Sequence, residues 1–370
     1  MKRIALIHDW LTGMRGGEKV LEVLADIFPR ADIFTLVHVP GQVSPAIERH
    51  RIITSPIQKI PNAGKIYRQL LPLLPAAMET LNFRGYDLLI STSHCVAKNA
   101  RPPAGVPHWS YMHTPMRYIW DQYDQYFGPG RASWPVRATM AAVRPYLQRW
   151  DLKTVPRVTH FLANSENVRG RIQRLYHRDA QVIYPPVDYE FFAAEPLLQG
   201  QEKSDFYLVV SALAPYKQID LALDACRTLG KKLVIIGDGQ ENRRLRLRAG
   251  PDVEFLGWRS GNELRDYYRR AQGLLFPGEE DFGIVPLEAM AAGCSVLALG
   301  KGGALETVVH GETGFFFQDP SVESLCNAIQ QNEKVPLDII KMRKRAEQFS
   351  RARCEAAFRA LFVEYRDEMS

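Results

Sequence analysis

Short apolar runs alternate with amphipathic helical patterns along almost the whole chain of 370 residues. Apolar runs of four to eight residues predict buried strands, whereas apolar positions spaced three and four apart predict helices, as in Gly17–Phe28 and Ile219–Leu229. Strand–helix alternation is typical of parallel sheets covered by helices, so the predicted fold class is α/β. The predicted strands are Arg3–His8, Ala31–Val37, Asp87–Thr92, His108–Met112, Val158–Ala163, Phe206–Ser211, Lys232–Gly237, Val253–Leu256, Gly273–Phe276 and Ser295–Leu299.

The alternation is interrupted once, at the Tyr-Pro-Pro-Val-Asp sequence of residues 184–188. Two adjacent prolines exclude a helix there, and a polar stretch follows before the strands resume. A chain of this length exceeds what one hydrophobic core usually serves. We therefore predict two Rossmann-like domains, 1–185 and 186–348, that face each other across a cleft. A helix is predicted over 342–365, with the terminal segment 349–370 packing back on the first domain.

Composition narrows the classes of protein. Five scattered cysteines without a C-x-x-C pair argue against a disulfide framework or a zinc site and favour a cytoplasmic location. The apolar run Ile4–Ile7 is too short for a signal peptide, and no run approaches the roughly 20 apolar residues that span a bilayer. The net charge of +6 is compatible with nucleic acid, phosphorylated ligands or an anionic membrane surface, and alone separates none of them.

The most informative motif runs from Gly273 to Gly293 and has the pattern of a strand, a glycine-bearing loop and a helix. Pro286 is tolerated in a first helical turn, so the helix is predicted to begin near Gly283. The backbone N–H groups there have no partner within the helix and form a site for a diphosphate. Glu280 and Glu288 flank this helix start. They either hold sugar and ribose hydroxyls or merely favour the helix dipole.

Three further segments carry candidate residues. Lys217 follows a predicted strand and precedes a helix, where it meets a phosphate or is a solvated surface lysine. The first loop, His8 to Glu18, contains Gly16 and Gly17 at a predicted helix start, yet lacks the G-x-G-x-x-G spacing of a dinucleotide site. His113 follows a strand whose carboxyl end is where ligands bind in open α/β sheets. It is either a sugar-binding residue or a satisfied core histidine.

These segments resemble the family-4 retaining glycosyltransferases, which have the GT-B fold. The carrying motifs are the Glu-x-Phe-Gly core at 280–283 with Glu288-Ala-Met-Ala and Gly293, the Gly-Gly-x-Glu of the first loop, and the His-Thr-Pro-x-Arg-Tyr-x-Trp-Asp run at 113–121. The last run is similar to a bacterial subgroup that builds surface polysaccharides, often as mannosyltransferases. One position departs from the family pattern, because Ala212 stands where the arginine of Gly-Arg-Leu-x-x-x-Lys is expected.

The resemblance implies a role for each matching residue. Glu280 and His113 would position the donor sugar, Glu288 would bind the ribose, and Lys217 would neutralise the diphosphate. For the cation missing at Ala212 two alternatives stay open beside the resemblance: Lys217 carries more of that load, or another basic group such as Arg15 or Arg117 substitutes. Arg15 and Arg117 are also candidates for binding the acceptor. The other expected donor-binding residues are Gly16, Gly17, Trp258, Phe282, Gly283, Ile284 and Val285.

The implied reaction is metal-independent transfer of a hexose, with GDP-mannose as the preferred donor, to a glycan or a polyprenyl-diphosphate-linked acceptor. No cofactor, metal or nucleic-acid partner is expected. The alternatives are a UDP-sugar donor, a nucleotide-sugar epimerase, a nicotinamide-dependent oxidoreductase and a non-catalytic sugar-binding relative.

A basic, aromatic segment at 131–150 also stands out. Met140, Val143, Leu147 and Trp150 share a helical stripe, and a second basic segment lies near Leu70–Leu74. Such a helix either docks on anionic lipid at the inner face of the cytoplasmic membrane or packs on its own domain. The sequence leaves both open.

Overall fold

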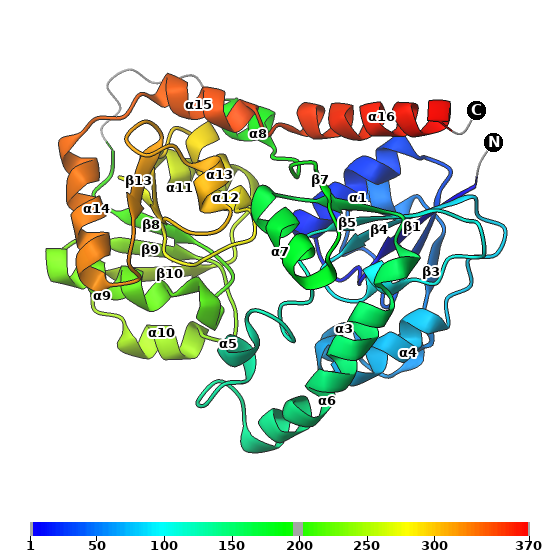
Figure 1. Cartoon of the computed structure of the whole chain (residues 1–370). Helices are drawn as coiled ribbons and strands as arrows, with labels where there is room; N and C mark the ends of the chain where they lie inside the picture. The colour runs from blue at the N-terminus through cyan, green and yellow to red at the C-terminus, as the bar shows by residue number, and fades with distance from the viewer. Residues whose placement is uncertain (1–2, 195–202, 369–370) are drawn as a thin grey trace. The chain divides into compact units, whose positions relative to one another are not determined.

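The computed structural model describes residues 3–194 and 203–368 and divides into two units, residues 1–186 with 352–370 (unit one) and residues 187–351 (unit two) (Figure 1). Each unit has one parallel sheet with helices around it, so the predicted α/β fold class is confirmed. All ten predicted strands are present. Within the described residues no helix is both long enough and apolar enough to cross a bilayer.

Unit one contains a seven-stranded parallel sheet in the order β3-β2-β1-β4-β5-β6-β7. Its strands are β1 (Ile4–His8), β2 (Asp32–Thr35), β3 (Ile52–Thr54), β4 (Leu88–Ser93), β5 (His108–Met112), β6 (His160–Ala163) and β7 (Gln181–Val182). Its helices are α1 (Gly16–Ile27), α2 (Pro45–Glu48), α3 (Ala63–Ile66), α4 (Leu74–Glu79), α5 (Tyr123–Phe127), α6 (Trp134–Lys153), α7 (Glu166–Tyr176) and α16 (Arg351–Glu368). The short 3₁₀ turns are η1 (Pro56–Lys59), η2 (Tyr67–Leu73), η3 (Ala97–Asn99) and η4 (Val155–Arg157).

Unit two contains a six-stranded parallel sheet in the order β10-β9-β8-β11-β12-β13. Its strands are β8 (Tyr207–Val210), β9 (Leu233–Ile236), β10 (Val253–Gly257), β11 (Leu274–Phe276), β12 (Val296–Leu299) and β13 (Gly314–Phe317). Its helices are α8 (Tyr189–Ala193), α9 (Ile219–Leu229), α10 (Asn242–Arg248), α11 (Gly261–Arg270), α12 (Ile284–Ala291), α13 (Ala304–Thr307), α14 (Val322–Lys334) and α15 (Ile339–Glu347), with the 3₁₀ turn η5 (Pro215–Lys217).

Successive residues of a central strand feed cores on opposite faces of the sheet. In β1, Ala5 and Ile7 belong to one buried cluster, whereas Leu6 belongs to another that includes Cys354 and Phe358 of α16. Because side chains alternate along a strand, a strand with helices on both faces must be apolar throughout. This explains why β1 appears in the sequence as a continuous apolar run.

The single helix predicted over 342–365 is wrong. The structure has two helices, α15 and α16, separated by Gln348, Phe349 and Ser350. At this interruption the chain pairs with the segment after β7, since the Val187 N–H donates to the Phe349 carbonyl (3.0 Å) and the Arg351 N–H donates to the Val187 carbonyl (3.2 Å). These backbone bonds replace helical ones, which a sequence pattern of apolar spacing does not reveal.

Along each parallel sheet the strand numbers fall to one strand and then rise, so the order of the strands changes direction at one place. In unit one this switch point lies between β1 and β4, and in unit two it lies between β8 and β11. Loops that leave the carboxyl ends of such neighbouring strands run to opposite sides, which opens a crevice where ligands bind in open α/β sheets. Ligand-binding residues are therefore expected at these two places.

Candidate active site

The switch point of unit two brings Lys217 and Glu280 together. Lys217 ends η5 after β8, and Glu280 lies in the loop after β11, so neighbouring strands deliver the two side chains. They form an ion pair whose members are only 13% and 16% exposed. The pair lines a cavity of about 10 Å³, room for one water and far too little for a sugar. A sugar therefore does not fit into this cavity while the two side chains are paired.

Close backbone approach makes this arrangement possible. A Cβ on Gly278 would lie 2.7 Å from the Lys217 Cα, and a Cβ on Gly302 would lie 2.4 Å from the Glu280 carbonyl oxygen. The Gly303 N–H also donates to that carbonyl (2.9 Å). Glycines at 278 and 302 thus let two loops touch the one that carries Glu280. Sequence reasoning missed both glycines, since only the folded loops reveal the contacts.

Helix α12 begins at Ile284, directly after Gly283, as the position of Pro286 predicts. Gly283 has φ +89°, a left-handed conformation that favours glycine. The N–H groups of the first turn have no acceptor within the helix. Ile284 and Val285 are half-buried, and this helix start can bind an anion through its amides and dipole.

The second glutamate has a different environment. Glu288 lies within α12, is 8% exposed and accepts a hydrogen bond from the Tyr268 hydroxyl of α11 (3.3 Å). Burial and the nearby Glu288 charge raise the pKa of Tyr268 well above its usual range, so the tyrosine stays a donor at neutral pH. Tyr268 thereby holds the Glu288 carboxylate in one orientation.

Three other predicted positions of unit two differ in their exposure to solvent. Phe282 is buried against Phe349, with ring centroids 5.6 Å apart, so its side chain belongs to the core. Ala212 is exposed after β8, at the same edge of the sheet as Lys217. Trp258 follows β10, the outermost strand on this side, and is 73% exposed.

In unit one, Asp9 organises the switch point. Its buried carboxylate accepts four backbone N–H groups of the loop after β4, from His94, Cys95, Val96 and Ala97, at 2.6–2.9 Å. His94 Nδ1 lies 3.2 Å from the same carboxylate. Asp9 therefore fixes the loop between β4 and η3. Sequence reasoning did not select Asp9, although a polar residue at the end of an apolar strand was the available signal.

Gly17 and His113 also meet in unit one. A Cβ on Gly17 would lie 3.3 Å from His113 Nε2 and 3.4 Å from the His8 ring, so a larger residue would press on both rings. His113 Nε2 is buried and has no hydrogen-bond partner among the described residues. Burial, followed by the charges of His94, His8 and Arg117, holds the pKa of His113 well below its usual value. The ring is neutral at pH 7 and can donate or accept one hydrogen bond.

The first turn of α1 is fixed by Glu18, whose carboxylate accepts the Arg15 N–H (3.1 Å) and lies 3.7 Å from His8 Nε2. Burial raises the pKa of Glu18, but its contacts with His8 outweigh that effect and hold the pKa below the usual value. Arg15 itself is exposed at the helix start, and Gly16 begins the helix.

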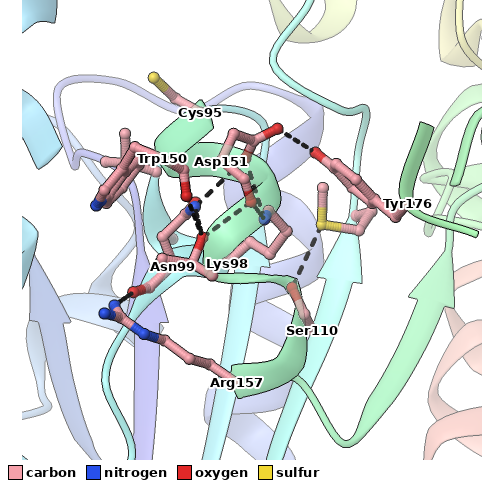
Figure 2. A network of polar contacts seen from close by, with 12 residues as sticks. Cys95, Lys98, Asn99, Ser110, Trp150, Asp151, Arg157 and Tyr176 are labelled. Carbon is pink, nitrogen blue, oxygen red and sulfur yellow. Dashed lines mark hydrogen bonds and ion pairs between the residues drawn. The ribbon is translucent and has the colours of Figure 1, made fainter. Parts of the chain in front are cut away.

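Figure 2 shows a buried polar network around Lys98, Asn99, Asp151 and Tyr176. The Asp151 carboxylate of α6 pairs with Lys98 Nζ (3.0 Å) and accepts hydrogen bonds from Trp120 Nε1 (2.9 Å) and the Tyr176 hydroxyl (2.8 Å). Lys98 and Asp151 are completely buried. The network ties η3, α6 and α7 to the segment that carries His113 and Arg117. It was not predicted, because its members are scattered over almost 80 positions.

The neutral histidines of unit one predict an acid-sensitive stability. Burial lowers the pKa of His94, His108 and His113, that of His108 to about 3. In the unfolded chain a histidine has a pKa of about 6.5. Below that pH the unfolded state binds protons that the folded state does not bind, so the free energy of unfolding falls. We expect the urea midpoint to fall as the pH is lowered from about 7.5 to about 5, that is, through the histidine pKa of the unfolded chain.

His108→Gln tests this account, since glutamine retains a donor for the Ser91 hydroxyl that His108 Nε2 contacts at 2.9 Å. The midpoint of this variant should depend less on pH than that of the wild type. An equal midpoint of the wild type at the two pH values would contradict the prediction.

Two family models match the chain. The model for "Glycosyltransferase Family 4" matches residues 14–191, and the model for "Glycosyl transferases group 1" matches residues 196–353. The two matches run through both units and include the loops that carry His113, Lys217 and Glu280. The chain belongs to the family-4 glycosyltransferases.

Two curated relatives of this family-4 chain are named mannosyltransferases. The O-antigen chain mannosyltransferase RfbU of Salmonella typhimurium is 28% identical over 192 residues, 50% of this chain and 53% of the relative. The GDP-mannose-dependent alpha-(1-6)-phosphatidylinositol monomannoside mannosyltransferase of Mycobacterium tuberculosis is 29% identical over 194 residues, 45% of this chain and 50% of the relative. The matched region thus spans about half the length of these relatives.

The similarity to a solved structure covers almost the whole chain. HepE of Anabaena, in complex with UDP and glucose, superposes with a TM-score of 0.70 over 98% of this chain and all of that one, at 18% identity. The fold is therefore GT-B, with two Rossmann-like domains.

Proposed function

We propose that this protein is a retaining glycosyltransferase that transfers a hexosyl group from a nucleotide sugar to a glycan or lipid-linked acceptor. The observation that carries the proposal is the meeting of Lys217 and Glu280 beside the start of α12, at the switch point of unit two. This arrangement suits a sugar diphosphate. The lysine and the helix N–H groups bind phosphate oxygens, and the carboxylate binds sugar hydroxyls.

Each residue has a chemical task in this proposal. When the donor binds, Lys217 leaves Glu280 and pairs with the diphosphate, and the freed carboxylate accepts hydroxyl hydrogens of the sugar. Glu288, oriented by Tyr268, binds the ribose. The amides of Ile284 and Val285 stabilise the negative charge that grows on the departing diphosphate, so the transfer needs no metal ion. The exposed Trp258 provides an aromatic face for the base.

Unit one would bind the acceptor and offer a hydrogen-bonding group to a sugar. His113 is neutral, and its Nε2 faces Gly17 at the start of α1, so the ring can share a hydrogen bond with a sugar hydroxyl. Arg15 and Arg117 remain our candidates for the cation that Ala212 does not supply. The reaction is proposed to take place in the cytoplasm.

GDP-mannose is the proposed donor, since two relatives are named mannosyltransferases and one of these is named GDP-mannose-dependent. The second candidate is a UDP-sugar, because HepE was solved with UDP and glucose.

A thermal-shift comparison of GDP-mannose with UDP-sugars tests the donor. At a hundredfold excess over Kd, a ligand stabilises the folded state by about 2.7 kcal/mol, which raises the Tm of a unit of this size by about 5–10 °C. We expect GDP-mannose to give such a shift and UDP-glucose to give a small one. The reverse order would transfer the proposal to a UDP-sugar, and no shift with either would contradict nucleotide-sugar binding.

A further inference from the structure

Two segments of unit one carry positive charge and no acidic residue. Residues 55–78 and 125–150 together contain seven Lys and Arg and no Asp or Glu. The remaining 320 residues contain 40 Lys and Arg and 41 Asp and Glu. These two segments therefore account for the whole net charge of +6, and the rest of the chain is close to neutral.

The two segments pack on a shared core. Leu71 and Leu74 belong to the same buried cluster as Met140 and Leu147 of α6. Trp150 Nε1 of α6 donates to the Glu79 carboxylate at the end of α4 (3.3 Å). The apolar stripe of Met140, Val143, Leu147 and Trp150 thus packs on its own domain and not on lipid.

The opposite face of α6 is exposed and carries large apolar residues. Trp134, Tyr146 and Leu152 are 76%, 48% and 42% exposed. Exposed alanines lie between them, and the exposed cations Arg149 and Lys153 lie on the same side of the helix. We call these exposed residues the outer face of α6. The 20-residue helix is about 30 Å long, so the face is an extended strip.

We propose that the outer face of α6 docks on an anionic lipid bilayer. Trp and Tyr side chains prefer the boundary between headgroups and acyl chains, whereas Lys and Arg bury their stems and keep their charges among anionic headgroups. The complete lack of Asp and Glu from residue 125 to residue 150 removes repulsion from such a surface. A second copy of this chain fits less well, since a twofold contact would place cations against cations.

The buried Asp151–Lys98 pair supports this docking. It fixes the carboxyl end of α6 to the sheet through η3, so the helix would dock as a rigid part of unit one. Docking does not depend on the proposed transferase activity, because binding to vesicles is measured without a donor or an acceptor.

Vesicle flotation with the full chain tests the inference. We expect the protein to float with vesicles of equal parts phosphatidylcholine and phosphatidylglycerol at about 0.1 M salt, and not with phosphatidylcholine alone. Removal of two charges by Arg149→Gln with Lys153→Gln should weaken the partition coefficient by about 30-fold. Removal of two aromatic anchors by Trp134→Ser with Tyr146→Ser should weaken it by about tenfold or more.

A matched control makes the same kinds of change elsewhere. Leu247 is 82% exposed on α10 of unit two, and Arg243 is exposed on the same helix. Leu247→Ser with Arg243→Gln should leave flotation unchanged. Equal flotation of all variants, or none of the wild type with anionic vesicles, would overturn the inference. Binding to duplex DNA without vesicle binding would overturn it too and assign the basic face to nucleic acid.

Discussion

Replacement of Asp151 by asparagine is expected to lower the free energy of unfolding by about 3–5 kcal/mol. The substitution keeps the shape of the side chain but leaves the completely buried Lys98 ammonium without its counter-charge. Burial already lowers the pKa of Lys98, and the Asp151 charge opposes that effect. Without the carboxylate, the lysine must lose its proton or draw in water. Urea unfolding at pH 7, followed by tryptophan fluorescence, measures the change.

A double variant separates the charge from the packing. Lys98→Met with Asp151→Asn removes both charges, so it should be more stable than Asp151→Asn alone. Asp179→Asn is the matched surface control, since Asp179 pairs with Arg169 at 3.0 Å but is 71% exposed. It should unfold like the wild type. If Asp151→Asn behaved like Asp179→Asn, the network would not stabilise unit one.

Replacement of Glu280 by glutamine is expected to reduce kcat/KM for transfer by about 100-fold or more. Glutamine fills the same space, but it lacks the charge that strengthens hydrogen bonds to sugar hydroxyls and that pairs with Lys217 in the free protein. The fold should survive, because Glu280 lies in a loop and its backbone carbonyl still accepts the Gly303 N–H. Initial rates with saturating acceptor measure the effect.

The neighbouring carboxylate provides the control for this substitution. Glu279→Gln removes the same charge one residue earlier in the same loop and should retain transfer within about threefold. If Glu280→Gln kept full activity with an unchanged Tm, the assignment of Glu280 to the sugar site would be wrong. Equal losses for the two variants would point to the charge of the loop as a whole.

The sequence predicted most of the sheets because buried strands are continuous apolar runs. It missed β3, β7 and β13, of which β7 has two residues and β3 has three. A strand of that length leaves no periodic pattern, and its place follows from pairing with a neighbour. The end of β1 illustrates the same limit, because Ile4–His8 is visible in the sequence but the partners of Asp9 lie 85–88 residues later.

The candidate site shows a similar division. Lys217, Glu280 and Gly283 stood out through their place between strands and helices and through resemblance to a family. The ion pair of Lys217 with Glu280 and the hydrogen bond of Tyr268 to Glu288 depend on how loops and helices pack, so no local pattern encodes them. Lys98 and Asp151 looked like ordinary charged residues, although the fold buries both.

Calorimetric titration of GDP-mannose into Lys217→Met tests the central claim most directly, namely that unit two binds the donor diphosphate at its switch point. Lys232→Met is the control, because Lys232 is 61% exposed on its side chain and precedes β9 at the opposite end of the sheet. One charge-assisted contact is worth about 1.5–3 kcal/mol, so Lys217→Met should raise Kd by about 10- to 150-fold, whereas Lys232→Met should leave it unchanged. An unchanged Kd for Lys217→Met would contradict the account.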